Sequence, residues 1–146
     1  SLSNSRLAFL SQVLYLGPQP GGKKSLTARE NLEWFAGVNG VKQAFDVRDV
    51  LSKVGLAGYE DIPCHQMSAG QHRRVGLARL YFDRSPIWVL DEPFTAIDIQ
   101  GVARLEALIE SRASEGGLVV LTTHQALSIK HFHMLALEKP ARSTYV

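Results

Sequence analysis

The stretch I-W-V-L-D-E-P, Ile87 to Pro93, decides the fold. Its first part, Ile87–Asp91, is short and densely apolar, which is typical of a strand buried in a parallel sheet. Asp91 and Glu92 stand where this strand ends, at the sheet edge where open α/β proteins bind ligands. Because successive strand residues point to opposite faces, the two carboxylates are expected to act differently. One suits a magnesium ion, and the other suits an attacking water molecule in phosphoryl transfer.

Outward from this stretch, apolar spacing alternates between strand and helix patterns. Further strands are expected at Gln12–Gly17, Leu118–His124 and Phe132–Leu137. Helices are expected over about 27–52 with a break near Gly37–Gly40, from about Ala69 to Asp83, from about Ile99 to Ser114, and from Gln125 to about Lys130. The pattern predicts an α/β fold with a mostly parallel sheet and a helical insertion.

Bulk properties describe an ordinary globular protein. The chain has 146 residues, enough for one domain with a real core, and a net charge of +2. So small a charge favours neither nucleic-acid nor membrane-surface binding. Cys64 is the single cysteine, so no intrachain disulfide can form, which fits a reducing compartment. The chain begins with Ser1 rather than Met.

A second stretch, G-P-Q-P-G-G-K-K from Gly17 to Lys24, has the G-x-x-x-x-G-K spacing of a phosphate-binding loop. Its chemistry argues against that function. Lys24 stands where a magnesium-binding Ser or Thr is required, and Pro18 and Pro20 have no N–H to donate. The next helix begins only at a capping box, Thr27 to Glu30. The sequence therefore predicts a proline-stiffened turn between a strand and a later helix.

Two more motifs accompany D-E-P in a fixed order. M-S-A-G-Q, Met67 to Gln71, opens a helix, where a hydroxyl, small residues and the helix dipole can face an anion. T-T-H ends at His124, just past a predicted strand. Taken singly, the first is an ordinary serine N-cap, the second a surface turn, and D-E-P a plain strand end. Together they indicate one phosphate-handling site.

With all three motifs present, the chain resembles the ATP-binding-cassette (ABC) ATPases. S-A-G-Q resembles their signature motif, with Ala69 where glycine is commoner, and I-W-V-L-D-E-P resembles the Walker B motif with its catalytic glutamate. F-T-A-I-D, ending at Asp98, resembles the D-loop, and His124 resembles the switch histidine. Gln19 takes the place of the Q-loop glutamine. The resemblance implies a P-loop NTPase fold of the ABC type, truncated at the N-terminus, with ATP and Mg²⁺ as ligands.

The resemblance also implies a role for each residue. Glu92 would be the catalytic carboxylate that positions water, and His124 would steady the γ-phosphate. Asp91 would hold the metal together with Gln19. The remaining nucleotide-binding positions would lie in the signature motif, which caps the ATP of a second subunit, and in the D-loop: Ser68, Ala69, Gly70, Gln71 and Asp98.

Connecting residues narrow the resemblance. L-Y-L-G-P-Q-P-G, L-T-A-R-E-N-L, M-S-A-G-Q-H-R-R-V, L-D-E-P-F-T-A-I-D, G-V-A-R-L-E and T-T-H-Q resemble the ATPase subunits of bacterial cytochrome c maturation haem exporters. Pro18 and Met67 depart from the residues expected there, which are histidine and leucine. The resemblance implies a peripheral subunit on the cytoplasmic face of the inner membrane. Its partners would be integral-membrane transporter subunits and a second, head-to-tail ATPase subunit, with no nucleic acid and no direct haem binding.

The family's own P-loop lies before the Q-loop, and no second G-x-x-x-x-G-K-[ST] occurs in this sequence. We therefore expect the C-terminal portion of a longer protein, with a helical subdomain at about 20–70 and a RecA-like lobe at 71–140. By itself this portion is expected to bind ATP very weakly and not to hydrolyse it. Two alternatives stay open: a soluble ABC ATPase, and a non-catalytic protein that has lost its P-loop.

Other conspicuous residues receive structural assignments. Of Trp34, Phe35 and Phe45, at least one is expected in the core, and the others could contact a membrane subunit. H-R-R, His72 to Arg74, is predicted to be a solvated helix face. The following lack the spacing of a metal site and are taken as structural: Cys64, His65, His131 and His133.

Overall fold

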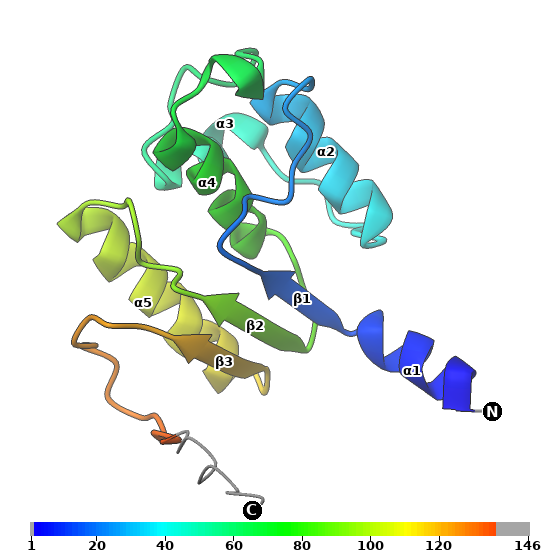
Figure 1. The fold of residues 1–146 in the computed structure, drawn as a ribbon, viewed down its shortest axis with the longest axis vertical. Coiled ribbons are helices and arrows are strands. Elements are labelled where there is room, and N and C mark those ends of the chain that lie inside the picture. Colours follow the sequence, from blue (N-terminus) through cyan, green and yellow to red (C-terminus); the bar gives the residue numbers. More distant parts are fainter. Residues whose placement is uncertain (1, 137–146) are drawn as a thin grey trace, which may run out of the picture.

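The computed structural model describes residues 2–136, and Figure 1 shows a sheet flanked by helices. The parallel sheet has the order β1-β2-β3, with β1 at Val13–Leu16, β2 at Ile87–Asp91 and β3 at Leu118–Thr122. The helices are α1 (Leu2–Leu10), α2 (Ala28–Val38), α3 (Val47–Lys53), α4 (Ala69–Ala78) and α5 (Ile99–Ser114), with 3-10 turns at Cys64–Gln66 and Arg79–Tyr81. All three strands lie where the apolar runs predict them, and the parallel order brings their carboxyl ends to one edge.

One face of the sheet carries the core. Leu14 and Leu16 of β1 and Trp88 and Leu90 of β2 alternate with less buried neighbours, as the two-residue strand period requires. α5 packs against β3 and supplies the buried Leu105 and Ile109. The opposite face is open within residues 2–136, where its most exposed apolar side chains are Tyr15, Leu118 and Val120. Ile87 and Val89 of β2, in the run that predicts a buried strand, are half-buried on this open face.

Helices α2, α3 and α4 form a layer beside the sheet (Figure 1), in which α4 packs against α2 and α3, whereas α1 lies apart from them, next to the start of β1. The predicted capping box starts α2: the Thr27 hydroxyl accepts from the Glu30 N–H at 3.2 Å, and the Glu30 carboxylate accepts from the Thr27 N–H at 2.8 Å. Phe35 is buried while Trp34 is partly exposed, and Phe45 stacks on Phe82 at 4.1 Å between ring centroids. A core position for at least one of these aromatics is confirmed.

The two elements predicted after β3, a helix and a last strand, do not form in the described residues. The helix expected at Gln125–Lys130 does not form, because α5 takes its backbone donors. The Ser128 N–H donates to Glu106 at 2.7 Å, and the Lys130 N–H donates to Glu110 at 3.1 Å. Residues 132–136 have no strand partner in the described chain, and Leu137 lies outside it, so the last strand is also wrong. No helix between residues 2 and 136 is long and apolar enough to cross a membrane.

Candidate nucleotide site at the strand ends

The carboxyl ends of β2 and β3 bring two of the predicted site residues into contact. His124 Nε2 lies 3.1 Å from Glu92 Oε1, although thirty-one other residues separate them in the sequence. The His124 side chain is 94% exposed and that of Glu92 is 30% exposed. Because β2 and β3 are parallel neighbours with Asp91 opposite Thr122, the one or two residues that follow each strand emerge at the same edge of the sheet. The pair is therefore open to solvent and free to meet a ligand.

Thr122 organises both acidic residues, and sequence reasoning did not single it out. Its hydroxyl donates to Asp91 Oδ1 at 2.6 Å and accepts from the Glu92 N–H at 3.1 Å. Its carbonyl oxygen also accepts from that N–H, at 3.1 Å. Glu92 has a φ of +49°, in the left-handed region that non-glycine residues rarely adopt. The threonine thus fixes the orientation of Asp91 and one side of an unusual peptide. Its position within T-T-H was the available signal.

Arg73 is the main correction to the sequence analysis. H-R-R was predicted to be a solvated face, yet His72 and Arg73 are buried, at 5% and 9% exposure. One terminal nitrogen of Arg73 donates to the Pro18 carbonyl at 2.7 Å, and the other donates to the Glu92 carbonyl at 2.6 Å. Burial follows because strand-end carbonyls, which lack ladder partners, attract a guanidinium. Residue type alone gave no sign of this.

Gln19 lies next to this junction. Pro18, whose carbonyl accepts from Arg73, directly precedes it, and the Gln19 side chain is exposed. One guanidinium therefore connects the Gln19 turn to the end of β2. This turn is the proline-stiffened connection that the sequence predicts, since α2 begins only at Ala28.

The far end of the turn is fixed by Asn31, which sequence reasoning also missed. Asn31 is fully buried on α2. Its side chain accepts from the Lys23 N–H at 2.8 Å and donates to the Lys23 carbonyl at 2.9 Å. A Cβ at Gly22 would lie 2.9 Å from Asn31 Oδ1, so only glycine fits there. The turn is thus held by Arg73 at one end and Asn31 at the other.

The predicted signature turn caps α4. Ser68 accepts from the Gln71 N–H at 3.1 Å, and Gln71 accepts from the Ser68 N–H at 2.9 Å. Gln71 also donates to the Tyr59 hydroxyl at 3.0 Å. Ser68 and Ala69 are exposed, and Gly70 is half-buried. The first N–H groups of the helix have no intrahelical acceptor, so this outward-facing turn can still meet an anion.

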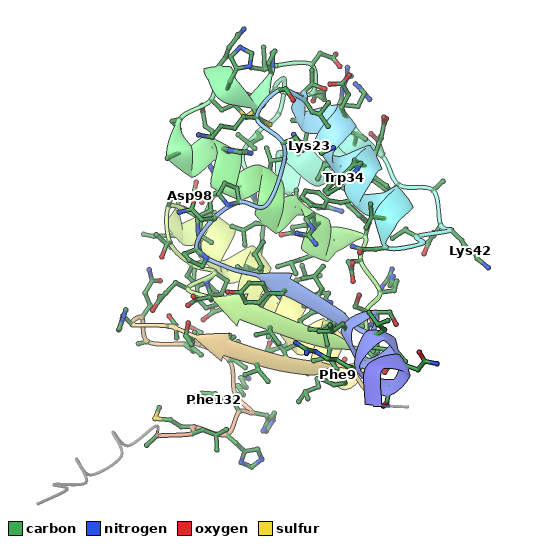
Figure 2. All side chains as sticks on the ribbon, turned by 45° about the vertical axis from the view of Figure 1, so that its right-hand side comes forward. Phe9, Lys23, Trp34, Lys42, Asp98 and Phe132 are labelled. Atoms are coloured by element: carbon green, nitrogen blue, oxygen red, sulfur yellow. The ribbon has the colours of Figure 1, made fainter. Side chains whose placement is uncertain are left out.

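The predicted D-loop lies against that turn. A Cβ placed on Gly70 would meet the Ala96 methyl at 3.4 Å, and Ala96 itself has a φ of +63°. Asp98 caps α5 by accepting from the Gly101 N–H at 2.7 Å, and its side chain remains exposed (Figure 2). Two sequence motifs that are separate along the chain therefore share one surface.

The same edge of the sheet carries side-chain oxygens that suit a magnesium ion. Between residues 2 and 136, no three His, Cys, Asp or Glu side chains are grouped as a metal site. Mg²⁺ needs less, because it commonly takes one or two protein oxygens and completes its shell with water and phosphate. The Asp91 carboxylate and the exposed Gln19 amide are oxygen donors of that kind, so they fit this ion.

A family model described as ABC transporter matches residues 2–95. The chain belongs to the ABC transporter family. The matched residues hold the Gln19 turn, the signature turn and the Asp91–Glu92 pair, whereas His124 lies beyond them. The resemblance that the motifs carry is thereby confirmed.

Named relatives of this ABC chain share one description. This chain is 58% identical over 130 residues to the "cytochrome c biogenesis ATP-binding export protein CcmA" of Saccharophagus degradans, and the match covers 83% of this chain and 58% of that protein. It is 51% identical over 126 residues to the protein of that name in Salmonella typhi, covering 86% and 60%. The chain thus spans about 60% of the length of these relatives.

Solved structures agree on the fold. An ATP-binding subunit of an ABC transporter superposes with a TM-score of 0.75 at 22% identity, covering 84% of this chain and 52% of that one. The ATP-binding cassette MJ0796, in a dimeric post-hydrolysis state bound to ADP and Pi, gives 0.66 at 23% identity, covering 83% and 56%. The mostly parallel ABC ATPase fold is therefore confirmed.

Proposed function

We propose that the chain belongs to the ATP-hydrolysing subunit of a membrane ABC transporter that powers haem export for cytochrome c biogenesis. The contact between Glu92 and His124 at the strand ends carries the proposal. It supplies a carboxylate and an imidazole at one solvent-open point, beside a second carboxylate held by Thr122. The substrate assignment rests on the relatives named for cytochrome c biogenesis.

Each residue has a distinct part in the proposed reaction. Glu92 orients the water that attacks the γ-phosphate and accepts its proton. His124 donates a hydrogen bond to the γ-phosphate from the neighbouring strand. Asp91 and Gln19 would hold Mg²⁺, which when bound would supply charge neutralisation for the phosphate oxygens. The Thr122 hydroxyl would keep Asp91 in place for this role, because it donates to Asp91 Oδ1.

The signature turn serves a second subunit. Ser68, Ala69, Gly70 and Gln71 face outward on α4, where helix N–H groups and the helix dipole favour a phosphate. We propose that they cap ATP bound by a head-to-tail partner, with Asp98 joining the two sites. Integral-membrane subunits would dock on the helical layer, and the protein would then lie at the cytoplasmic face of the bacterial inner membrane. A helical subdomain at about 20–70 and a RecA-like lobe at 71–140 remain our proposed division.

The test is ATP turnover by the complete gene product assembled with its membrane partners. Glu92→Gln removes the proton acceptor and keeps the shape, so turnover is expected to fall about 1,000-fold while ATP binding stays. Glu115→Gln makes the same chemical change at the exposed C-cap of α5, outside the helical layer, and should leave turnover unchanged. Turnover that survives Glu92→Gln would exclude Glu92 as the catalytic carboxylate. A wild-type assembly that binds ATP without turnover would favour the non-catalytic alternative.

The 146-residue stretch by itself holds no P-loop motif. We propose that it binds ATP very weakly and does not hydrolyse it, because backbone N–H groups of that loop supply most of the phosphate binding energy. Single-turnover hydrolysis by the purified stretch would contradict this.

A further inference from the structure

We propose that Arg73 is a positioning residue, which holds Glu92 and the Gln19 turn in the arrangement that hydrolysis requires. The proposal rests on the proposed function. It concerns a residue of α4 that touches neither carboxylate side chain of the site.

The guanidinium of Arg73 joins two separate strand ends. Nη1 donates to the Pro18 carbonyl at 2.7 Å and approaches the Gly17 carbonyl at 3.4 Å. Nη2 donates to the Asp91 carbonyl at 3.0 Å and to the Glu92 carbonyl at 2.6 Å. The turn after β1 and the end of β2 are therefore held by one rigid planar group.

Burial makes this arrangement demanding. Arg73 is 9% exposed, and no carboxylate within residues 2–136 forms an ion pair with it. A buried cation without a counterion is stable only if its donors are satisfied. Here backbone carbonyls alone satisfy the two terminal nitrogens, and Nε has no hydrogen-bond partner in the same residues. If the carbonyls of Pro18, Asp91 and Glu92 moved away, the buried positive charge of Arg73 would lose its hydrogen-bond acceptors.

The guanidinium of Arg73 helps to hold the backbone of Glu92 in its unusual conformation. Its φ of +49° is costly for a residue with a side chain, so neighbours must impose it. Thr122 holds the Glu92 N–H, and Arg73 holds the Glu92 carbonyl. With the carbonyl released, the peptide is free to relax toward an ordinary φ, which would swing the carboxylate away from His124.

α4 connects this group to the signature turn. Arg73 follows Ser68 by five residues on the same helix, so a displacement of the turn carries the guanidinium with it. Gln19 and Glu92 would then move together.

The experiment compares Arg73→Met with a matched control in the complete gene product and its membrane assembly. Methionine keeps the apolar stem and loses every donor. Because a misplacement of about 1 Å can cost roughly 100-fold in rate, kcat should fall about 100-fold while KM for ATP changes less than about threefold. Arg73→Lys retains one donor nitrogen without the planar fork, so its kcat should lie between those of Arg73→Met and wild type.

Arg112→Met is the control. Arg112 is also a largely buried arginine whose guanidinium donates to backbone carbonyls, of Arg84 and Ser85, but at the opposite end of the sheet. Its loss should lower stability and leave kcat per folded molecule within about threefold of wild type. Circular dichroism and a thermal melt give the folded fraction of each variant.

The outcomes separate this inference from the proposed function. A wild-type assembly that does not hydrolyse ATP would contradict the proposed function itself. With an active wild type, an unchanged kcat in Arg73→Met, or an equal loss in Arg112→Met, would overturn the positioning role. Should Arg73→Met fail to fold, Arg73→Lys decides: a wild-type kcat there rejects the inference, and a reduced kcat at unchanged KM supports it.

Discussion

Thr122 and Asp91, opposite each other on β3 and β2, are joined by a hydrogen bond of 2.6 Å between Oγ1 and Oδ1. The bond holds the Asp91 carboxylate in one orientation at the end of β2. Threonine suits this position, because it is β-branched, as strand residues commonly are, and also carries the hydroxyl that donates to the carboxylate.

Thr122→Val should therefore weaken magnesium binding. Valine keeps the shape and removes the donor, so Asp91 loses its fixed orientation and the Glu92 N–H loses one of two acceptors. Partners of metal ligands typically contribute 10- to 100-fold, so the magnesium concentration at half-maximal turnover should rise roughly 10-fold. Thr122→Ser keeps the hydroxyl and should stay near wild type. An unchanged magnesium titration for Thr122→Val would show that this hydroxyl does not orient a metal ligand.

Asn31→Leu should be among the most destabilising single changes in the helical layer. The side chain is fully buried and bonds both the N–H and the carbonyl of Lys23, with further donation to Thr27 and Cys64. Leucine fills the space but leaves those groups without partners, at a cost of about 1–3 kcal/mol for each one that stays buried. Urea unfolding of the protein should show a total loss of roughly 2–4 kcal/mol.

Asn39→Ala is the comparison for that change. Asn39 is exposed and donates to the buried Asp83 at 3.0 Å. A hydrogen bond to a charged group contributes about 1.5–3 kcal/mol, and water can take the place of the exposed Asn39 side chain, so its loss should cost about 1.5 kcal/mol or less. Equal effects at the two sites would mean that Asn31 is not the anchor of the Gln19 turn.

Much of the fold follows from local patterns. The run I-W-V-L-D gives β2, and Thr27 with Glu30 starts α2 as predicted, because both signals act over a few neighbouring residues. The meeting of Glu92 with His124 was also foreseeable, since parallel neighbours end at one edge.

The misses share a physical cause, which is tertiary partners that compete with local preference. Ser128 lies in a helical pattern, yet its N–H is taken by Glu106 of α5. Arg73 belongs to a run of basic residues that is typical of a solvated helix face, yet it is buried because it donates to carbonyls at two strand ends. Neither partner is near in sequence, so periodicity could not reveal them.

Stability should depend on pH through His72. Burial first, and the nearby Lys24 charge second, lower the pKa of His72 from its ordinary 6.5. Between that lowered pKa and 6.5 the unfolded chain binds more protons than the folded protein, so the unfolding free energy falls as the pH drops through this window. Above it the histidine contributes no pH dependence.

His72→Gln removes this titration, so the loss of stability between pH 7.5 and pH 5.5 (roughly one unit either side of an ordinary histidine pKa) should shrink. Urea unfolding at the two pH values measures it. His131→Gln, at an exposed position, should keep the wild-type dependence. A steeper decline in His72→Gln would contradict the assignment.

Glu106 should govern how tightly the segment after His124 is held. The carboxylate is buried at 8% exposure and accepts from the Ser128 N–H at 2.7 Å, while Ile129 is the segment's buried anchor. A hydrogen bond to a charged group contributes about 1.5–3 kcal/mol, so Glu106→Ala should increase local opening roughly 10-fold or more. Brief trypsin treatment should then cleave faster after Lys130, as mass spectrometry of the fragments would show. Glu106→Gln keeps an oxygen acceptor and should be cleaved at nearly the wild-type rate, and equal cleavage of the alanine variant and wild type would mean that packing of Ile129 alone holds the segment.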